Sequence, residues 1–497
     1  MRWLIYAGEM AIYHSLKELL TGIVFPLPQD ISSSPIRSLQ LNSQEVNPGD
    51  LFFALPGIHL DGRTYILDAI NRGAAAVVYE ENDTPLPIST VVPLIPVKNL
   101  GKKISDIAAR FYHHPSKSLN VIGVTGTNGK TSISHFIGQA LQCGVMGTMG
   151  NGVLPYLKRS PLTTLDAIRL QKQLAEFHDQ GVGTVVMEVS SHALDQHRVE
   201  SVKFDTVIFT NVTQDHLDYH RNMESYFTAK ARLFQFPSVQ HSIINVDNYY
   251  GKILANSAQG KVLTTSLFDA NADLFIEDIR PMVKGYQASV QTPWGAGRFQ
   301  TVILGDFNFS NLLAVLAVLN IQGLAFEESL IRLEALTPVP GRLEHFKIDD
   351  MPEIFVDYAH TPDALEKVLK VLRAHGNGKV WCVFGCGGNR DRTKRPMMGR
   401  IAEIYSDHLI ITNDNPRTED PHGIVNDILT GVIKKEAVPV IYDRKTAIHY
   451  AIEKAAPEDV ILIAGKGHED YQWIGEQRLP FDDRECVKEL LVQRKVA

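Results

Sequence analysis

Short runs of apolar residues recur along the chain, and segments with helical spacing or turn-forming residues separate them. Ile104, Ile107, Ala108 and Phe111, for example, have the spacing of one helix face. The runs that we expect to form buried strands are 51–55, 74–79, 91–97, 184–187, 207–210, 242–246, 354–356, 379–384, 408–412, 438–442 and 460–464. Strands that alternate with helices are typical of parallel sheets, so the pattern predicts an α/β fold.

The stretch VIGVTGTNGKT at 121–131 combines a buried strand with a glycine-rich turn, and helical spacing follows it from Ile133 to Leu141. Strand, glycine-rich loop and helix are the context of a phosphate-binding P-loop, here a variant with Val124 in place of the first glycine. Lys130 is expected to reach the terminal phosphates, and the Thr131 hydroxyl to hold Mg²⁺. The alternative is a glycine-rich turn that carries a surface lysine.

Proline and glycine clusters divide this chain of 497 residues, for which a prior of ~150 residues per domain suggests three domains. One helix stripe ends at His113-His114-Pro115, and Pro338-Val339-Pro340-Gly341 forms a second break. We predict three domains: a small α/β N-terminal domain over 1–105, a central P-loop domain with a parallel sheet over 106–340, and a C-terminal Rossmann-like domain over 341–497.

The amino-acid composition excludes several classes of protein. A hydrophobic content of 44% is ordinary for a soluble globular protein, and the net charge of −7 provides no basic surface for nucleic acid. Four cysteines are too few for a disulfide scaffold, and no uncharged run approaches the ~20 residues of a membrane span. We therefore expect a cytoplasmic, soluble protein with neither nucleic acid nor a membrane as a partner. We also expect a monomer, although composition does not decide the oligomeric state.

Polar residues follow two strands of the central domain, where parallel sheets place ligands. Glu188 comes directly after one strand, and it could meet the Mg²⁺ of the P-loop or cap the next turn. Asp215 and His216 belong to NVTQDHLDYH, a cluster that could bind a metal or form a polar loop. Lys230 lies in a predicted helix, and by itself it is a solvated lysine.

Two further groups of polar residues are candidates for binding. Asn308 and Asn311 precede an apolar helix and could face one ligand, or form an N-cap and a turn. In the third domain the loops 385–392, 414–417 and 465–469 each follow a predicted strand and should gather at one sheet edge. There Arg390 and Arg417 could grip the carboxylate of a zwitterion, and Glu469 its amine.

The order of these motifs resembles the Mur ligases, ATP-dependent amide-forming enzymes of peptidoglycan synthesis in the bacterial cell wall. The motifs are GVTGTNGKT, MEVSSHALDQHR, TNVTQDHLDYH, YFTAK, GDFNFSN, VPGRLE, VDYAHTPDAL, FGCGGNRDRTKRP, DNPRTEDP and GKGHEDYQ. The resemblance implies the addition of meso-2,6-diaminopimelate to the D-Glu γ-carboxylate of UDP-MurNAc-L-Ala-D-Glu through an acyl phosphate. ATP would be a substrate, two Mg²⁺ ions would be cofactors, and Lys230 would be carbamylated.

The resemblance also implies roles for individual residues. Lys130, Lys230, His216 and Glu188 would be catalytic, and Thr131, Glu188, His216 and carbamylated Lys230 would face metal. ATP would contact Gly126, Thr127, Asn128, Gly129, Lys130, Thr131, Asn308, Asn311, Arg342 and Asp357. The sugar nucleotide and its peptide would contact Leu41, Ser43, Ile58, His59, Leu60, Thr163, Thr164, Ser190, Gln196 and Arg198. The incoming amino acid would contact Arg390, Asp414, Asn415, Pro416, Arg417, Gly465 and Glu469.

Other interpretations remain open. Within the fold the chain could be a lysine-adding homologue or a ligase like folylpolyglutamate synthase, and outside it a P-loop ATPase module without ligase chemistry. The choice of amino acid depends on Arg417 in DNPR, since diaminopimelate differs from lysine by one carboxylate that a guanidinium can bind. The alternative for Arg417 is a surface salt bridge with Glu419 or Asp420.

Overall fold

The computed structural model describes residues 14–24, 35–57, 60–81 and 90–496, with side chains up to 493. Ile58 and His59, two of the predicted sugar-nucleotide contacts, lie outside the described residues. The chain forms two compact units. The first comprises Met1–Val121, Ser160–Val185 and Val189–Phe204, and the second comprises Ile122–Arg159, Val186–Glu188 and Asp205–Ala497.

The first unit contains a four-stranded parallel sheet in the order β3-β4-β5-β6. Its strands are β3 (Leu39–Gln40), β4 (Leu51–Ala54), β5 (Ala76–Glu80) and β6 (Leu94–Val97). Helix α3 (Leu100–Phe111) buries its apolar stripe against one face, while α2 (Ile66–Asn71) contributes to a core with Phe52, Ala54 and Val77. The predicted helix over 104–111 is confirmed. Helix α5 (Ala167–Asp179) adds Ala167 and Ile168 to the α3 core.

The remaining short elements of this unit are the antiparallel pair β1 (His14–Ser15) and β2 (Pro35–Ile36), with α1 (Leu16–Leu20) between them. Helix α6 (Ser191–Asp195) follows β11 in the chain, and the Ser190 hydroxyl caps it by accepting from the Ala193 N–H. A serine at the N-cap satisfies a backbone donor that the helix itself leaves unpaired.

A sheet of eleven strands has the order β10-β9-β8-β11-β7-β12-β13-β14-β15-β16-β17. Strands β12, β13 and β14 run parallel to β7; β12 and β13 were predicted from their apolar runs, whereas β14 was not. The bounds are β7 (Asn120–Thr125), β8 (Gly144–Gly147), β9 (Gly150–Val153), β10 (Tyr156–Lys158), β11 (Thr184–Glu188), β12 (Thr206–Phe209), β13 (His241–Asn245), β14 (Lys261–Ser266), β15 (Leu274–Pro281), β16 (Tyr286–Thr292) and β17 (Gly295–Thr301).

The antiparallel part β15-β16-β17 was not among the strands predicted from the sequence. In β16 the buried Ala288 and Val290 alternate with partly buried residues, so this strand forms no continuous apolar run. Helix α10 (Asp306–Ile321) packs into the core with almost every residue from Leu312 to Leu319 fully buried. It begins at Asp306 with Gly305 as N-cap, so the interpretation of Asn308 as an N-cap is wrong.

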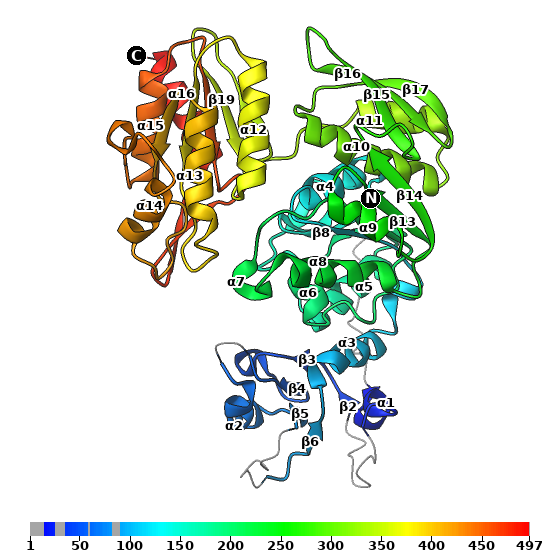
Figure 1. Cartoon of the computed structure of the whole chain (residues 1–497). Helices are drawn as coiled ribbons and strands as arrows, with labels where there is room; N and C mark the ends of the chain where they lie inside the picture. Colours follow the sequence, from blue (N-terminus) through cyan, green and yellow to red (C-terminus); the bar gives the residue numbers. More distant parts are fainter. Residues whose placement is uncertain (1–13, 25–34, 58–59, 82–89, 497) are drawn as a thin grey trace, which may run out of the picture. The chain divides into compact units, whose positions relative to one another are not determined.

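The last sheet has the order β18-β19-β22-β20-β21, parallel except for β18. The strands are β18 (Glu344–Phe346), β19 (Glu353–Asp357), β20 (Val380–Phe384), β21 (His408–Ile411) and β22 (Val460–Ala464). Helices α12 (Pro362–His375), α13 (Lys394–Tyr405) and α14 (Pro421–Leu429) cover one face, and α15 (Arg444–Lys454) and α16 (Asp483–Val496) cover the other (Figure 1). This is the predicted Rossmann-like arrangement.

The predicted strand over 438–442 is wrong. Only Val440 forms a bridge, to Ile411. Pro439 lies in the middle of this segment and has no N–H to donate, so a continuous ladder along β21 cannot form. Among the described residues no helix has the length and apolarity that would let it cross a membrane.

Candidate active site

Two glycines of the P-loop between β7 and α4 (Lys130–Leu141) lie so close to other residues that a larger side chain would not fit there. A Cβ on Gly126, whose φ is +148°, would overlap the Thr210 hydroxyl, and one on Gly129, whose φ is +93°, would lie 2.8 Å from Asn311 Oδ1. The Lys130 ammonium donates to the carbonyl oxygens of Gly126 at 2.8 Å and Thr127 at 2.9 Å. The loop is therefore compact, and its lysine lies over the loop's own carbonyls.

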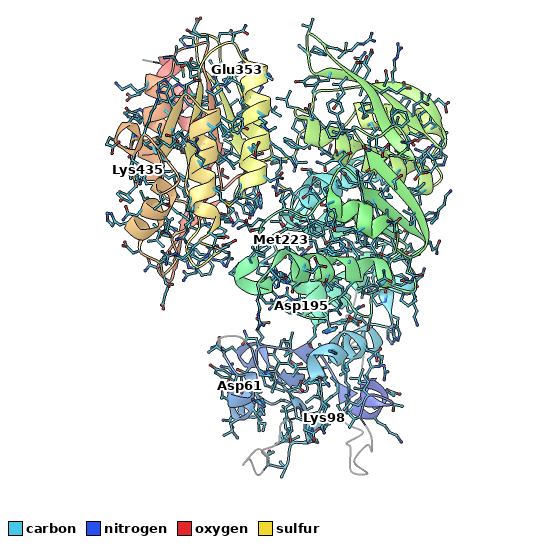
Figure 2. The ribbon with its side chains drawn as sticks, viewed as in Figure 1. Asp61, Lys98, Asp195, Met223, Glu353 and Lys435 are labelled. Atoms are coloured by element: carbon cyan, nitrogen blue, oxygen red, sulfur yellow. The ribbon has the colours of Figure 1, made fainter. Side chains whose placement is uncertain are left out.

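Lys230 is not a solvated lysine. It lies on α8 (Met223–Ala231), whose first residue is labelled in Figure 2, and only 1% of it is exposed. Its ammonium donates to the Gly126 carbonyl at 2.8 Å and lies 4.4 Å from the centre of the Tyr226 ring. Burial, with the charge of Lys130 as a second cause, lowers the pKa of Lys230 well below its usual value. The structure thus brings together two predicted site lysines that are far apart in the sequence.

Glu188 faces the beginning of α4. Its Oε2 accepts from the Thr131 hydroxyl at 3.1 Å and from the Thr148 hydroxyl at 3.1 Å, and its Oε1 accepts from the Thr148 N–H at 2.9 Å. A Cβ on Gly147 would overlap this carboxylate. The predicted sharing of one Mg²⁺ ion by Glu188 and Thr131 remains a prediction, and the sequence gives no signal for Gly147 at the end of β8 or for Thr148, which follows it.

Asp215 joins charged groups from distant segments. It is buried, and its carboxylate lies 3.4 Å from Lys394 Nζ, 3.3 Å from His216 Nε2 and 3.8 Å from His360 Nε2. Burial alone would raise the pKa of Asp215, but Lys394 and the two histidines outweigh it and hold the pKa well below its usual value. Asp215 and His216 of NVTQDHLDYH therefore belong to a charged cluster with Lys394 and His360, and the binding of a metal there remains a prediction.

Tyr226 connects these groups. Its hydroxyl is 3.1 Å from Thr127 Oγ1, its ring lies under Lys230, and the ring of His216 meets it edge-on with centroids 6.2 Å apart. In the sequence Tyr226 is only an aromatic residue four positions before Lys230. Its role as a polar contact of the P-loop depends on a pairing across the fold that spacing cannot predict.

A cavity of about 590 Å³ adjoins the P-loop. Within it Asn311 Nδ2 donates to Asn308 Oδ1 at 2.9 Å, and Asn308 Nδ2 donates to the Leu304 carbonyl at 2.7 Å. The predicted ATP contacts that line this cavity are Asn128, Gly129, Asn308, Asn311, Arg342 and Asp357. Lining residues that the sequence did not indicate include Asn245, Asp247, Phe268 and Tyr286.

Arg342 precedes β18 and Asp357 is the last residue of β19, and both line this cavity. Arg342 Nη2 donates to the Thr131 hydroxyl at 3.0 Å, its guanidinium lies 4.5 Å from the Tyr358 ring centre, and its buried Nε has no hydrogen-bond partner among the described residues. Asp357 accepts from the backbone N–H groups of Leu343 and Ala359, both at 2.7 Å. Burial raises the pKa of Asp357.

The three predicted loops of the last sheet do lie together, at the carboxyl ends of its strands. The Gly388 N–H donates to the Asn415 carbonyl at 2.9 Å, Arg417 Nη1 donates to the Gly388 carbonyl at 2.7 Å, and Asn415 Nδ2 donates to Glu469 Oε2 at 2.8 Å. Pro416 is buried between them, and a Cβ on Gly465 would meet the Asp414 carboxylate. The sheet topology explains this convergence, because the loops follow β20, β21 and β22.

Arg417 does not form the surface salt bridge that was the alternative. Glu419 is bound by the fully buried Arg395, at 2.6 Å from Nη1, and Arg417 instead packs 5.4 Å from the centre of the Trp473 ring. The Arg417 backbone is left-handed with φ +54°, and its buried Nε has no partner among the described residues. Burial lowers the pKa of Arg417, and the nearby charge of Arg390 lowers it further. Two guanidinium groups here favour a bound anion.

Lys466 was not among the site residues predicted from the sequence. It is fully buried, and its ammonium contacts Glu469 Oε2 at 3.0 Å and Asn415 Oδ1 at 3.2 Å. The predicted amine-binding carboxylate of Glu469 thus already has one cationic partner. A lysine in GKGHED looks solvated from sequence alone, and only the packing of the loops shows that it is buried.

Four of the predicted sugar-nucleotide and peptide contacts cluster in the first unit. The Ser190 N–H donates to Thr164 Oγ1 at 3.0 Å, Arg198 Nη1 donates to the Thr164 carbonyl at 2.9 Å, and Arg198 Nε donates to Gln196 Oε1 at 3.0 Å. Thr163 precedes Thr164 in the chain. The other predicted contacts of this unit are the half-buried Leu41, the buried Ser43 and Leu60, which is 67% exposed.

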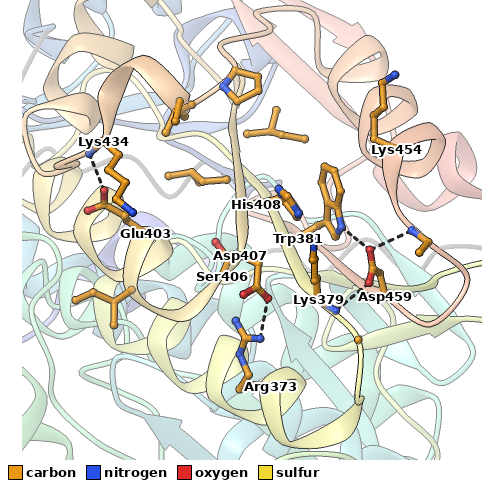
Figure 3. Close-up of a pocket in the computed structure, with 18 of the residues that line it drawn as sticks. Arg373, Lys379, Trp381, Glu403, Ser406, Asp407, His408, Lys434, Lys454 and Asp459 are labelled. Atoms are coloured by element: carbon orange, nitrogen blue, oxygen red, sulfur yellow. Dashed lines mark hydrogen bonds and ion pairs between the residues drawn. The ribbon is translucent and has the colours of Figure 1, made fainter.

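A second cavity, of about 1130 Å³, opens at the opposite edge of the last sheet, and none of the predicted site residues lines it (Figure 3). Here Trp381 stacks on His408 with ring centroids 4.0 Å apart, and Asp459 accepts from Trp381 Nε1 at 2.9 Å. These residues lie at the beginnings of their strands. In open parallel sheets ligands bind at the carboxyl ends instead, so the three loops are the better candidate site.

Three models of the Mur ligase family match the chain: its catalytic domain over 35–112, its middle domain over 124–319 and its glutamate ligase domain over 341–467. A Coxiella burnetii protein named UDP-N-acetylmuramoyl-L-alanyl-D-glutamate–2,6-diaminopimelate ligase is 49% identical over 468 residues, 92% of this chain and 96% of its own length. A Pseudomonas syringae protein of the same name is 47% identical over 457 residues, 90% of this chain and 94% of its own length.

A solved structure described by the same name is 36% identical and superposes with a TM-score of 0.68, covering 97% of this chain and 99% of its own. This similarity extends through both compact units and all three groups of site residues. Sequence motifs, fold and full-length similarity agree, and we conclude that the chain belongs to the Mur ligase family.

Proposed function

We propose that this protein is an ATP-dependent ligase that adds meso-2,6-diaminopimelate to the D-Glu γ-carboxylate of UDP-MurNAc-L-Ala-D-Glu. The observation that carries the choice of amino acid is Arg417, whose partly buried guanidinium lies beside Arg390 and lacks a carboxylate partner among the described residues. The Glu469 carboxylate is joined to the same loops through Asn415. One such site can bind both a carboxylate and an ammonium group.

The reaction has two steps. An oxygen of the γ-carboxylate attacks the γ-phosphorus of ATP, and ADP leaves, so that an acyl phosphate forms. The deprotonated amine then attacks the acyl carbon, phosphate leaves with the C–O bonding pair, and the amine proton passes to solvent. Both reactants of the first step are anionic, so charge neutralisation by Lys130 and the P-loop N–H groups is the main contribution expected of the protein.

Mg²⁺ fits the donors at Thr131 and Glu188. A hydroxyl oxygen and a buried carboxylate lie 3.1 Å apart there, and Mg²⁺ prefers oxygen ligands. When bound, Mg²⁺ would neutralise phosphate charge. Thr131 and Glu188 would hold one ion. His216, beside Asp215, and Lys230 would face a second, for which Lys230 must first lose its positive charge.

Carbamylation would remove that charge. The lowered pKa of Lys230 favours the neutral amine, whose nitrogen lone pair can attack CO₂ and form a carbamate with loss of one proton. The product is anionic and offers oxygen ligands to Mg²⁺. We therefore assign Lys230 as a carbamylated metal-facing residue, with His216, Glu188 and Lys130 as the other catalytic residues.

The remaining substrate contacts are assigned by segment. We assign UDP binding to the domain over 1–105 through Leu41, Ser43 and the 58–60 loop, and the peptide end to Thr163, Thr164, Ser190, Gln196 and Arg198. ATP is assigned to the domain over 106–340 and the amino acid to the domain over 341–497. The protein would act in the cytoplasm as a monomer on three small-molecule substrates, in peptidoglycan precursor synthesis.

Phosphate release with UDP-MurNAc-L-Ala-D-Glu, ATP and one amino acid at a time tests this function. We expect release with meso-diaminopimelate and little with L-lysine, and almost none when either the amino acid or the sugar nucleotide is omitted. Lys130→Ala should lose nearly all release while Lys445→Ala, which alters an exposed ion pair with Glu489, keeps it. Lysine-dependent release would identify a lysine-adding homologue, and release without any amino acid an ATPase module.

A further inference from the structure

Two histidines and a glutamate form a cluster far from the nucleotide and amino-acid loops. His345 lies on β18, Glu353 begins β19 and His375 ends α12. Glu353 Oε2 is 3.0 Å from His345 Nε2 and 2.9 Å from His375 Nε2, and all three ligand atoms lie within 4.8 Å of one another. Figure 2 labels Glu353 in this part of the C-terminal domain. Asp357, which lines the nucleotide cavity, is at the opposite end of β19.

The two imidazole rings are held in place by one buried side chain. Phe355 is fully buried, and the His345 ring stacks on it with centroids 4.4 Å apart and planes 5° apart. The His375 ring meets the same phenyl group edge-on at 5.4 Å. Because both rings pack on Phe355, their Nε2 atoms converge without the entropy cost of ordering two free side chains.

We propose that His345, Glu353 and His375 form a binding site for a divalent transition-metal ion, with Zn²⁺ as the best match. Two imidazoles and one carboxylate are a common ligand set for zinc, and a fourth position remains for water. Each imidazole would bind through a deprotonated Nε2 and keep its proton on Nδ1. Mg²⁺ would be a poor occupant, because it prefers oxygen ligands.

The charge states of His345 and Glu353 favour the binding of a cation. Burial lowers the pKa of His345, which favours the neutral imidazole that a metal requires. Burial alone would raise the pKa of Glu353, but hydrogen bonds from Lys347 and His375 outweigh it and bring the pKa to about 2. The Glu353 carboxylate therefore faces two imidazoles and the Lys347 ammonium.

A substitution of Lys347 provides a specific test of the proposed metal site. Its ammonium pairs with Glu353 Oε1, and its side chain is 58% exposed. This cation competes with a metal for the negative charge of Glu353, and it can be removed without disturbing the core. A bound ion would connect the β18–β19 hairpin to the end of α12, so it should act on stability and not on the chemistry of ligation.

Zinc binding to the whole protein tests the site. Isothermal titration with ZnCl₂ is run in excess Mg²⁺, which competes with Zn²⁺ at sites made of oxygen ligands alone. We expect one Zn²⁺ per chain, and Co²⁺ should give visible absorption of a low-coordinate nitrogen–oxygen site. His345→Gln, His375→Gln and Glu353→Gln should each weaken binding by at least about tenfold. His449→Gln, an exposed histidine 3.6 Å from Glu453, is the matched control and should bind normally.

Lys347→Gln should bind Zn²⁺ more tightly than the wild type by about two- to tenfold, because it removes the competing ammonium. This variant keeps all three ligands, so it tests the site even if a histidine variant fails to fold. Zinc that binds equally well to the His345→Gln variant, the absence of stoichiometric binding to the wild type, or unchanged affinity in Lys347→Gln would each overturn the proposal.

Discussion

Lys130 and Lys230 both donate to the carbonyl oxygen of Gly126, each at 2.8 Å. Two ammonium groups so close together are unfavourable in a buried site, and burial together with the charge of Lys130 lowers the pKa of Lys230. The P-loop lysine and the helix α8 lysine therefore act as one electrostatic unit. Converting the second into an anion would turn their repulsion into attraction.

Carbamylation of Lys230 leads to our first prediction. Lys230→Arg keeps a positive charge and cannot form this carbamate, so its ligation rate should fall by at least about a hundredfold. Lys230→Ala should be equally inactive but partly rescued by acetate or formate, whose carboxylates supply the missing oxygens. Rates are compared with those of Lys445→Arg, an exposed lysine paired with Glu489. Full activity of Lys230→Arg would exclude the carbamate.

Arg417 should decide between diaminopimelate and lysine. The two amino acids differ by one carboxylate, and a buried guanidinium left unpaired can reject a substrate by roughly 10⁴–10⁵-fold. Arg417→Ala should lose most of its kcat/KM for diaminopimelate and much of its discrimination against lysine. Arg392→Ala is the matched control, because this arginine is 65% exposed and pairs with Asp427. An Arg417→Ala variant with unchanged preference would disprove the assignment.

A buried ion pair should dominate the stability of the C-terminal domain. Arg444 donates to both oxygens of Asp483 at 2.7 Å, both side chains are fully buried, and the pair joins α15 to α16. Arg444→Met should lower the free energy of unfolding by about 3–5 kcal/mol, since it leaves a buried carboxylate unpaired. Lys445→Met removes an exposed pair between the same two helices and should cost about 1 kcal/mol or less.

Urea denaturation of the two variants, followed by tryptophan fluorescence, measures this difference. The double variant Arg444→Met/Asp483→Leu should recover much of the loss, because it leaves no unpaired charge. Equal destabilisation by Arg444→Met and Lys445→Met would show that burial does not set the strength of this pair.

Two buried histidines should make the protein sensitive to acid. Burial, followed by the charge of Arg342, lowers the pKa of His135 to about 4 and that of His468 to about 3. The unfolded chain then binds more protons than the folded one below the ordinary histidine pKa of about 6.5, so stability must fall as the pH drops from there towards 4. Each histidine can contribute up to about 1.4 kcal/mol per pH unit in this range.

Urea unfolding at pH 7.5, 6.5, 5.5 and 5.0 measures that slope. His135→Gln and His468→Gln should each lose less stability on acidification than the wild type, whereas His449→Gln, which alters an exposed residue, should follow the wild type. The absence of any change in slope for the two buried positions would mean that other groups cause the acid sensitivity.

Local patterns in the sequence were enough to predict the class of fold. Helical spacing predicted α3 and the helix that follows the P-loop, and apolar runs predicted most strands of the parallel sheets, because burial imposes these periods on any sequence. The gathering of the loops 385–392, 414–417 and 465–469 also followed from the place of each loop directly after a predicted strand. The roles assigned to Lys230, Arg417 and the other site residues remain predictions.

The predictions that were wrong or missing also have local causes. Residues 438–442 are apolar enough for a strand, but Pro439 and the position beside β21 allow a single bridge. In the antiparallel strands β15, β16 and β17 no two consecutive residues are buried, so these strands contain no buried apolar run that could have predicted them. Asn308 could cap a helix by residue type, but the helix begins two residues earlier.

The sequence by itself determined which residues could bind phosphate, carboxylate and metal, because glycine spacing and charged residue types are local properties. Only the tertiary structure decided which polar side chains are buried and what they meet. Lys230 beside Gly126, Lys466 beside Asn415 and Arg395 beside Glu419 depend on contacts between distant segments. A lysine or arginine has the same local signature whether solvated or buried, and the low dielectric environment that changes its pKa exists only after the chain has packed.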